Sequence, residues 1–313
     1  MVSIITVNYN ETATTCALLD SIKRQGYRDV EVLVVDNASR ENPTSIFQVQ
    51  YPEVKFIRSE QNLGFAGGNN LALPLARGEY LFFVNNDAEI ASGCIEQLLQ
   101  HFESEPNAGI VSPLICYYPQ AGTDGTTPTP IVQYAGMTPL SAFTGRNYTL
   151  GEREPDHGQF AKPSQTAYAH GAAMMVPRKV LEQVGSMWEG FFLYYEELDW
   201  CERIRRSGFE VWVEPKARVW HKESLTLNKM GATKTYYLTR NRILFMRRNF
   251  GGWRLLVFFA FLIFVTLPKN GLVYILKGEF ENLNAFWKGI FSGIKSSTNF
   301  PKVLNFRKVL DAP

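Results

Sequence analysis

The chain has 313 residues, of which 45% are hydrophobic and 20% are charged, so it can fold around a large core and does not read as disordered. Its cysteines, Cys16, Cys94, Cys116 and Cys201, are far apart and form no C-x-x-C pair, which argues against a disulfide framework or a zinc site and favours a reducing cytoplasm. The first residues show no basic region before a long apolar stretch, so we expect no signal peptide.

Charge is distributed unevenly along the chain, although the formal net charge is only +2. Residues 1–228 contain 18 Lys and Arg against 27 Asp and Glu, a balance of −9, whereas residues 229–313 contain 14 against 3, a balance of +11. A basic tail on an acidic body predicts an anionic partner, either nucleic acid or the anionic face of a bilayer. Long aliphatic runs between the cations of this tail favour the bilayer and argue against nucleic acid.

Apolar, β-branched runs alternate with helix-like stretches in the first part of the chain. The runs cover residues 2–7, 30–35, 54–57 and 80–84, and the helix-like stretches cover residues 12–24, 65–77 and 93–103. Such alternation predicts an α/β fold with a mostly parallel, doubly wound, Rossmann-like sheet. Because the runs lack polar alternation, helices should cover both faces of the sheet.

The middle of the chain is less regular. Residues 117–165 read as an insertion, with a flexible loop at 122–130 and a short strand at 131–137. A second ordered block follows, with an apolar run at 172–176, a helix at 198–207 and strands at 209–213 and 218–220.

The C-terminal part is helical in character from Ala232 onward. Residues 255–267 are apolar except for Thr266, but this run is shorter than the roughly 20 residues that a spanning helix needs. With the cations that bracket it and the aromatic residues of 280–294, it predicts an extension that lies in the plane of a membrane surface. A helical pair packed on the body and a true span are the alternatives.

Polar residues end the first two predicted strands, at Asn8 and at Asp36. In open α/β sheets the carboxyl ends of such strands form the crevice that binds ligands. Asp36 therefore predicts a partner for nucleotide donor groups, with a turn cap as the alternative. The glycine-rich segment 62–70 opens a helix and offers backbone N–H groups to phosphate or ribose oxygens, with tight helix–strand packing as the alternative. It is not G-x-G-x-x-G, which argues against a dinucleotide dehydrogenase.

Asp87 follows the apolar run 80–84, where a carboxylate must be solvated, paired or bound to a metal. Sites for Mg²⁺ or Mn²⁺ in phosphate chemistry use one or two carboxylates together with phosphate oxygens of the substrate. His221, at the end of a predicted strand, is the candidate second ligand, and a structural histidine is the alternative.

Glu196, Glu197 and Asp199 follow five aromatic or apolar residues at the start of a predicted helix. The helix dipole alone favours acids in a first turn. Three acids in four positions exceed what capping requires, and clustered carboxylates in a partly apolar setting can have the raised pKa of a general base.

Several separated motifs now agree in order with one known family. They are "VNYN" at 7–10, "VVDNAS" at 34–39, "NLGFAGGNN" at 62–70, "VNNDAE" at 84–89, "GAAMMV" at 171–176, "FFLYYEELDWCERIRRSGF" at 191–209 and "VWH" at 219–221. The chain thus resembles glycosyltransferase family two, with its GT-A fold, over roughly residues 1–225. Within that family it looks most like bacterial rhamnosyltransferase-type enzymes that build O-antigen and other cell-wall polysaccharides on lipid-linked acceptors.

The resemblance implies a catalytic domain at 1–228, with a nucleotide-binding half at 1–115 and an acceptor half at 116–228, followed by the extension at 229–313. Asp87 and His221 would hold Mg²⁺ or Mn²⁺, although Asn85 replaces the first acid of the family's D-x-D motif. Glu197 would be the catalytic base, with Asp199 as its alternative. The implied nucleotide-sugar site comprises Val7, Asn8, Asp36, Asn70, Asn86 and Asp87.

The implied activity is inverting, metal-dependent transfer of a sugar, with rhamnose as a candidate, from a dTDP- or UDP-sugar to a lipid-linked or polysaccharide acceptor in cell-envelope glycan synthesis. The implied location is peripheral, on the cytoplasmic face of the plasma membrane. A nucleotide-sugar-binding protein without transfer activity is the main alternative. A sugar nucleotidyltransferase is disfavoured because no cation follows the first strand. The amphipathic tail could also support a homodimer.

Overall fold

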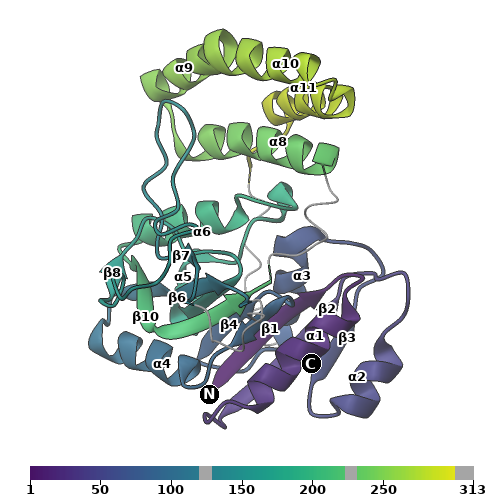
Figure 1. Cartoon of the computed structure of the whole chain (residues 1–313), viewed down its shortest axis with the longest axis vertical. Coiled ribbons are helices and arrows are strands. Elements are labelled where there is room, and N and C mark those ends of the chain that lie inside the picture. Colours follow the sequence, from purple (N-terminus) through teal and green to yellow (C-terminus); the bar gives the residue numbers. More distant parts are fainter. Residues whose placement is uncertain (120–128, 223–230, 300–313) are drawn as a thin grey trace.

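A single mixed sheet forms the centre of the protein, with helices packed on it and a helical layer at one end (Figure 1). The structure, a computed structural model, describes residues 1–119, 129–222 and 231–299. The strand order is β3-β2-β1-β4-β9-β6-β10-β5. The predicted α/β architecture is confirmed.

The first half of the sheet is parallel. β1 (Val2–Asn8) lies between β2 (Val30–Asp36) and β4 (Tyr80–Val84), and β3 (Lys55–Arg58) pairs with the outer side of β2. Within β1, Ile4 belongs to the core beneath α1, whereas Ile5 belongs to the core on the other face. Successive side chains of a strand point to opposite faces, so a strand covered on both sides must be apolar throughout.

The second half of the sheet mixes strand directions. β9 (Ala173–Pro177) runs antiparallel between β4 and β6 (Ala108–Tyr117), and β10 (Glu210–His221) runs parallel to β6. β5 (Ala88–Ile90) pairs antiparallel with β10, β7 (Val132–Tyr134) with β6, and β8 (Ser164–Gln165) with β10. Residues 209–213 and 218–220, predicted as two strands, belong to β10 alone, which continues through a register shift between Glu214 and Arg218.

The helices of the body follow the sequence pattern closely. They are α1 (Thr12–Lys23), α2 (Thr44–Gln50), α3 (Gly64–Ala72), η1 (Leu73–Leu75), α4 (Cys94–Ser104), α5 (Arg178–Val184), η2 (Glu189–Phe191) and α6 (Glu196–Arg206). The helix predicted over 65–77 ends at Ala72 and passes into the short turn η1, which contains Pro74. Proline has no N–H to continue an α-helix. The short helices α2 and α5 were not predicted.

The C-terminal layer comprises α8 (Gly231–Asn249), α9 (Gly252–Phe261), the π-helical η3 (Leu262–Thr266), α10 (Leu267–Leu276) and α11 (Phe280–Lys295). α9, η3 and α10 form one helix of 25 residues, so the expectation of a run too short to span is wrong. The π-helical turn ends two residues before Pro268. Such a turn is one of the irregularities by which a helix accommodates a proline.

By length and composition alone, this helix could cross a membrane, a criterion that core helices of soluble proteins also meet. Only 17% of its most apolar window is buried, however, so it is not a core helix here. It lies across the end of the molecule farthest from β1 and β2 (Figure 1). The loop predicted at 122–130 falls mainly, and the domain boundary after 228 wholly, outside the described residues.

Candidate active site

The carboxyl ends of β1 and β2 carry a hydrogen-bonded network around Asp36. Asn8 donates from Nδ2 to Asp36 Oδ1 at 2.8 Å, and Arg58 forms an ion pair with Asp36 Oδ2 at 2.6 Å. The backbone N–H of Ser39 donates to Asp36 Oδ2 at 3.3 Å. Asn8 and Asp36 are fully buried. Their contacts fix the two strand ends relative to each other, and Asp36 is paired without a ligand.

A cleft of about 220 Å³ opens beside this edge. Val7, Asn86 and Asp87 of the predicted site line it, whereas Asn8, Asp36 and Asn70 are buried outside its lining. Aromatic rings can stack on a planar base and amides can bond its polar groups. The cleft offers both kinds of side chain, in Tyr9, Asn37, Asn62, Phe65, Asn69, Asn85 and Phe192.

Asn70 connects α3 to the segment around η2. Its Nδ2 donates to Met187 O at 2.8 Å and to Glu189 Oε1 at 2.9 Å. On the same helix, a Cβ added to Gly68 would lie 2.9 Å from Val7 Cγ1. Both observations favour the packing alternative: Asn70 and Gly68 allow α3 to lie close to its neighbours.

Asp87 and His221 meet at the edge of the cleft. Asp87 directly precedes β5, and the pairing of β5 with β10 sets Ala88 opposite His221. As a result, His221 Nε2 lies 3.1 Å from Asp87 Oδ1, and both side chains are largely buried. The structure thus brings together the two residues predicted as metal ligands.

The ring of His221 is oriented by Gln133, a residue that the sequence did not indicate. His221 Nδ1 lies 2.8 Å from Gln133 Oε1, and a carbonyl oxygen can only accept, so Nδ1 carries the proton in this assignment. In neutral His221, the lone pair of Nε2 then faces the Asp87 carboxylate. Two acceptors this close require a proton or a cation between them.

These residues fit a divalent cation. A histidine oriented by a hydrogen bond from its other ring nitrogen is the usual form of a metal-ligating imidazole. Asn85 Nδ2 lies 3.4 Å from His221 Nε2, so the amide that replaces the usual acid also borders the pair. Among the described residues there is no group of three or more His, Cys, Asp or Glu that could hold a metal. The remaining ligands would have to come from the substrate, as is common for Mg²⁺ in phosphate chemistry.

Glu197 lies on the first turn of α6, close to the cleft wall. A Cβ built on Gly171 would lie 3.6 Å from the ring of Phe65, which lines the cleft, and 3.9 Å from the carboxyl carbon of Glu197. Burial raises the pKa of Glu197 to about 7, opposed by hydrogen bonds from the backbone N–H groups of Glu197 and Tyr195. A carboxyl group with a pKa near the operating pH can take up and release a proton.

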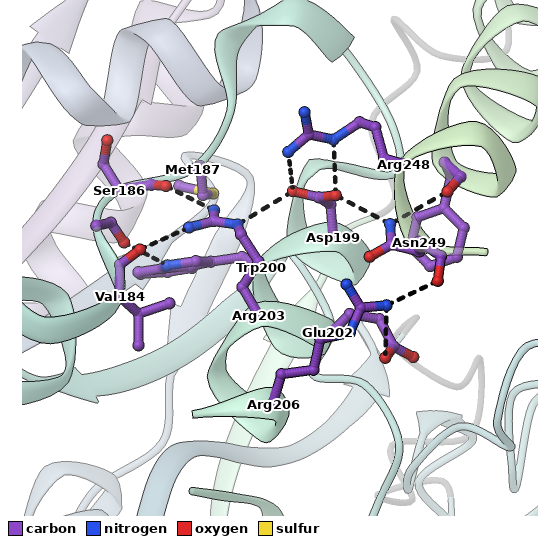
Figure 2. A network of polar contacts seen from close by, with 12 residues as sticks. Val184, Ser186, Met187, Asp199, Trp200, Glu202, Arg203, Arg206, Arg248 and Asn249 are labelled. Atoms are coloured by element: carbon purple, nitrogen blue, oxygen red, sulfur yellow. Dashed lines mark hydrogen bonds and ion pairs between the residues drawn. The ribbon is translucent and has the colours of Figure 1, made fainter. Parts of the chain in front are cut away.

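Asp199, the alternative base, lies in a dense ion-pair network (Figure 2). Its carboxylate pairs with Arg248 at 2.9 Å and with Arg203 at 3.2 Å, and accepts a hydrogen bond from Asn249 at 3.0 Å. The side chain is almost completely buried. Since Arg248 and Asn249 belong to α8, Asp199 joins the helix that carries Glu197 to the C-terminal layer.

A second contact with α8 holds the loop before Glu197. Asn241, which is fully buried, has its Nδ2 within 3.0 Å of the carbonyl oxygens of Phe191, Leu193 and Tyr194. Phe192, Tyr194 and Tyr195 have φ values of 67°, 70° and 77°, in the left-handed region that side chains other than glycine rarely adopt. Such a backbone persists only where its surroundings fix it. Nothing in the local sequence around Asn241 indicated this role.

Comparison with known proteins agrees with this geometry. The chain matches the family model described as glycosyl transferase family 2 over residues 3–185. The low-salt glycan biosynthesis hexosyltransferase Agl10 of Haloferax volcanii is 29% identical over 250 residues, which cover 77% of this chain and 74% of the relative. An N-acetylglucosaminyl-diphospho-decaprenol L-rhamnosyltransferase of Mycobacterium tuberculosis is 25% identical over 268 residues, which cover 80% and 85%.

Among solved structures, the mannosyltransferase PcManGT from Pyrobaculum calidifontis, in complex with GDP-Man and Mn²⁺, aligns with a TM-score of 0.56 at 17% identity. The alignment covers 94% of this chain and 86% of that one. At this identity the likeness shows the fold alone, and it confirms the GT-A-like mixed sheet. A binding protein without transfer activity is not favoured by these matches. With a family model matched over more than half of its length, the chain belongs to glycosyl transferase family 2.

Proposed function

We propose that this protein transfers a sugar, with inversion at the anomeric carbon, from a nucleoside diphosphate sugar to an acceptor hydroxyl. The single observation that carries the proposal is the arrangement around one cleft. Asp87 lines this cleft and pairs with His221, and Glu197, with its pKa raised to about 7, lies near Phe65, which lines the same cleft.

The chemistry is a single displacement. Glu197 accepts the proton of the acceptor hydroxyl while that oxygen forms a bond to the anomeric carbon, and the bond from this carbon to the diphosphate oxygen breaks. A divalent cation, Mg²⁺ or Mn²⁺, would be held by Asp87 and His221 and would neutralise charge on the departing nucleoside diphosphate. Asp199 is paired with two arginines, so we assign it to positioning α6 and assign the base to Glu197.

The substrates follow by analogy with the relatives. One relative is named for L-rhamnose transfer to a diphospho-decaprenol glycan and the other for hexose transfer in glycan biosynthesis. We therefore propose a dTDP- or UDP-sugar donor, with rhamnose as a candidate sugar, and a lipid-linked acceptor. A lipid-linked acceptor requires the enzyme to work at a membrane.

The C-terminal layer supports a peripheral membrane position. The helix from Gly252 to Leu276 exposes large apolar side chains, among them Leu256 at 72% and Phe264 at 77%. Residues 229–313 carry 14 Lys and Arg against 3 Asp and Glu. An exposed apolar face combined with cations is the pattern of a helix that lies on an anionic bilayer. The cytoplasmic face of the plasma membrane is the location we propose.

The test is a transfer assay with the full chain, a panel of nucleoside diphosphate sugars and a prenyl-diphosphate GlcNAc acceptor, with and without Mn²⁺. We expect a product of inverted anomeric configuration that forms only when the cation is present. A retained configuration, or transfer that is insensitive to a chelator, would contradict the mechanism.

A further inference from the structure

We propose that Arg242 of α8, assisted by Arg146, binds the diphosphate group of a lipid-linked acceptor. The inference rests on the proposed function and names a site for the second substrate. Arg242 is only 8% exposed, and its Nε has no hydrogen-bond partner among the described residues. In that part of the chain neither arginine forms a side-chain ion pair with a carboxylate.

A buried guanidinium without an anion is costly. Removing a charge from water carries a penalty that only a partner of opposite charge or several hydrogen bonds can offset. Arg203 of α6 and Arg248, six residues farther along α8, meet the requirement through Asp199. Arg242 does not, so an anion from outside the chain would complete its environment. Arginine binds phosphate oxygens through two parallel N–H donors.

The position of Arg242 is well defined by its neighbours. A Cβ added to Gly145 would lie 3.1 Å from Arg242 Cγ and 3.0 Å from a ring carbon of Phe258, so the loop that carries Arg146 packs against Arg242 and α9. Figure 1 shows this loop rising from the body toward α8 and α9. Burial raises the pKa of the Tyr195 hydroxyl to about 12. The positive charges of Arg242 and Arg146 oppose this rise, so both lie near that hydroxyl.

Two further buried polar atoms near Glu197 have no partner among the described residues. They are the hydroxyl of Tyr194 and Oε2 of Glu196. Buried polar groups are normally satisfied, so unpartnered atoms on the two residues next to or near Glu197 in the chain indicate a place where ligand atoms supply the missing bonds. A sugar hydroxyl and a diphosphate provide both donors and acceptors.

Glu197, Arg242 and α9 correspond in turn to the three groups of a lipid-linked sugar. The reacting hydroxyl would lie at Glu197, the diphosphate at Arg242, and the prenyl chain along α9. At the start of α9, Trp253 is 60% exposed, and its ring lies 6.0 Å from that of Phe143 in the same loop as Arg146. An apolar chain therefore has an apolar surface to follow once it passes the two arginines.

Two other phosphate sources fit this site less well. The donor diphosphate is already accounted for by Asp87 and His221 at the sheet edge, and Arg242 is not among the residues that line that cleft. A headgroup in a flat bilayer would favour exposed cations, whereas Arg242 is largely buried. We therefore assign the site to a phosphate carried on a longer ligand.

The test uses the full chain in detergent, with farnesyl diphosphate and farnesol as paired probes in titration calorimetry. We expect the wild type to bind farnesyl diphosphate more tightly than farnesol. Arg242→Gln should weaken farnesyl diphosphate binding by at least about tenfold, and Arg146→Gln by less, because that side chain is exposed. Lys234→Gln, the same charge change on the same helix, should have no effect. UDP affinity should stay unchanged in all variants.

Thermal melting distinguishes a ligand site from a structural role. Because Arg242 has no ion-pair partner among the described residues, the Arg242→Gln protein should melt at the same temperature as the wild type or higher. If Arg242 had a structural role, the variant protein would melt at a lower temperature. Equal wild-type affinity for farnesol and farnesyl diphosphate would overturn the proposal. A parallel loss of UDP affinity in Arg242→Gln would also overturn it. So would a loss of binding in this variant that is seen only with phosphatidylglycerol vesicles. Absent transfer with normal probe binding would refute the proposed function alone.

Discussion

The hydrogen-bonded network around Asp36 and the start of α6 differ in how their buried polar groups are paired. In the network around Asp36, the side chains of Asn8, Asp36 and Arg58 satisfy one another within the chain. At the start of α6, the Tyr194 hydroxyl and Glu196 Oε2 lack partners among the described residues, and Glu197 has a raised pKa. The first network is complete within the chain, whereas the second region leaves polar atoms that a ligand could pair under our proposal.

The contrast separates residues that stabilise the fold from residues that are available for chemistry. A satisfied buried network rigidifies its surroundings, while unsatisfied groups lower stability and are kept where function needs them. The same contrast exists within α6 itself. Asp199 is neutralised by Arg203 and Arg248, and Glu197, two residues earlier, has no ion-pair partner in the described part of the chain. The predictions below test this contrast.

The largest effect is expected for Glu197→Gln. It removes the group that takes the proton while keeping nearly the same shape, so turnover should fall by about 10²–10⁴-fold. Donor affinity, measured by calorimetry with UDP and Mn²⁺, should remain that of the wild type. If turnover stays near normal, the base lies elsewhere, and Asp199 becomes the next candidate.

Asp199→Asn should instead act on folding. It removes the charge that pairs with two largely buried arginines, and breaking such a pair costs about 3–5 kcal/mol of unfolding free energy. Urea denaturation measures this loss, and Glu197→Gln is the matched control because it should show none. A stable Asp199→Asn protein with no activity would reverse the two assignments.

Gln133→Leu tests the orientation of His221. Without the acceptor at 2.8 Å from Nδ1, the imidazole loses its fixed tautomer, and metal affinity should fall by about 10–100-fold. Mn²⁺ titration in the presence of UDP measures the change. Gln159→Leu, at an exposed glutamine far along the same insertion, serves as the control and should bind Mn²⁺ normally.

The remaining prediction concerns the pH dependence of stability. The pKa of Glu197 is raised in the folded protein, from 4.5 to about 7, so the folded state holds the proton more tightly. Stability from this group is fully present below pH 4.5 and is lost as the pH rises through about 7. Glu197→Gln should show a flatter stability profile across this window. The acid limb of kcat/KM for the wild type should have its midpoint near pH 7.

The local patterns predicted the first half of the sheet well. The apolar runs at 2–7, 30–35 and 80–84 became β1, β2 and β4, because strands covered on both faces are apolar throughout. The pairing of Asp87 with His221 was also expected, from the residue types and from the family resemblance. Its geometry depends on β5 and β10, which are far apart in sequence and pair antiparallel.

What the sequence could not predict depends on long-range contacts. Gln133 and Asn241 look like ordinary polar residues until the fold sets one against His221 and the other against the loop at 191–194. The role of Asp199 required α8 to be present beside α6. The apolar run 255–267 is shorter than a membrane span, but the helix extends beyond both of its ends, from Gly252 through η3 to Leu276.

The most direct test of the account is anomalous X-ray scattering from crystals grown with UDP and Mn²⁺. The central claim is that Asp87 and His221 gather the cation in the cleft that Glu197 borders. We predict one Mn²⁺ peak bonded to Asp87 Oδ1 and His221 Nε2, with UDP in the cleft lined by Val7 and Phe65. A peak held by other residues, or UDP bound away from this cleft, would contradict the account.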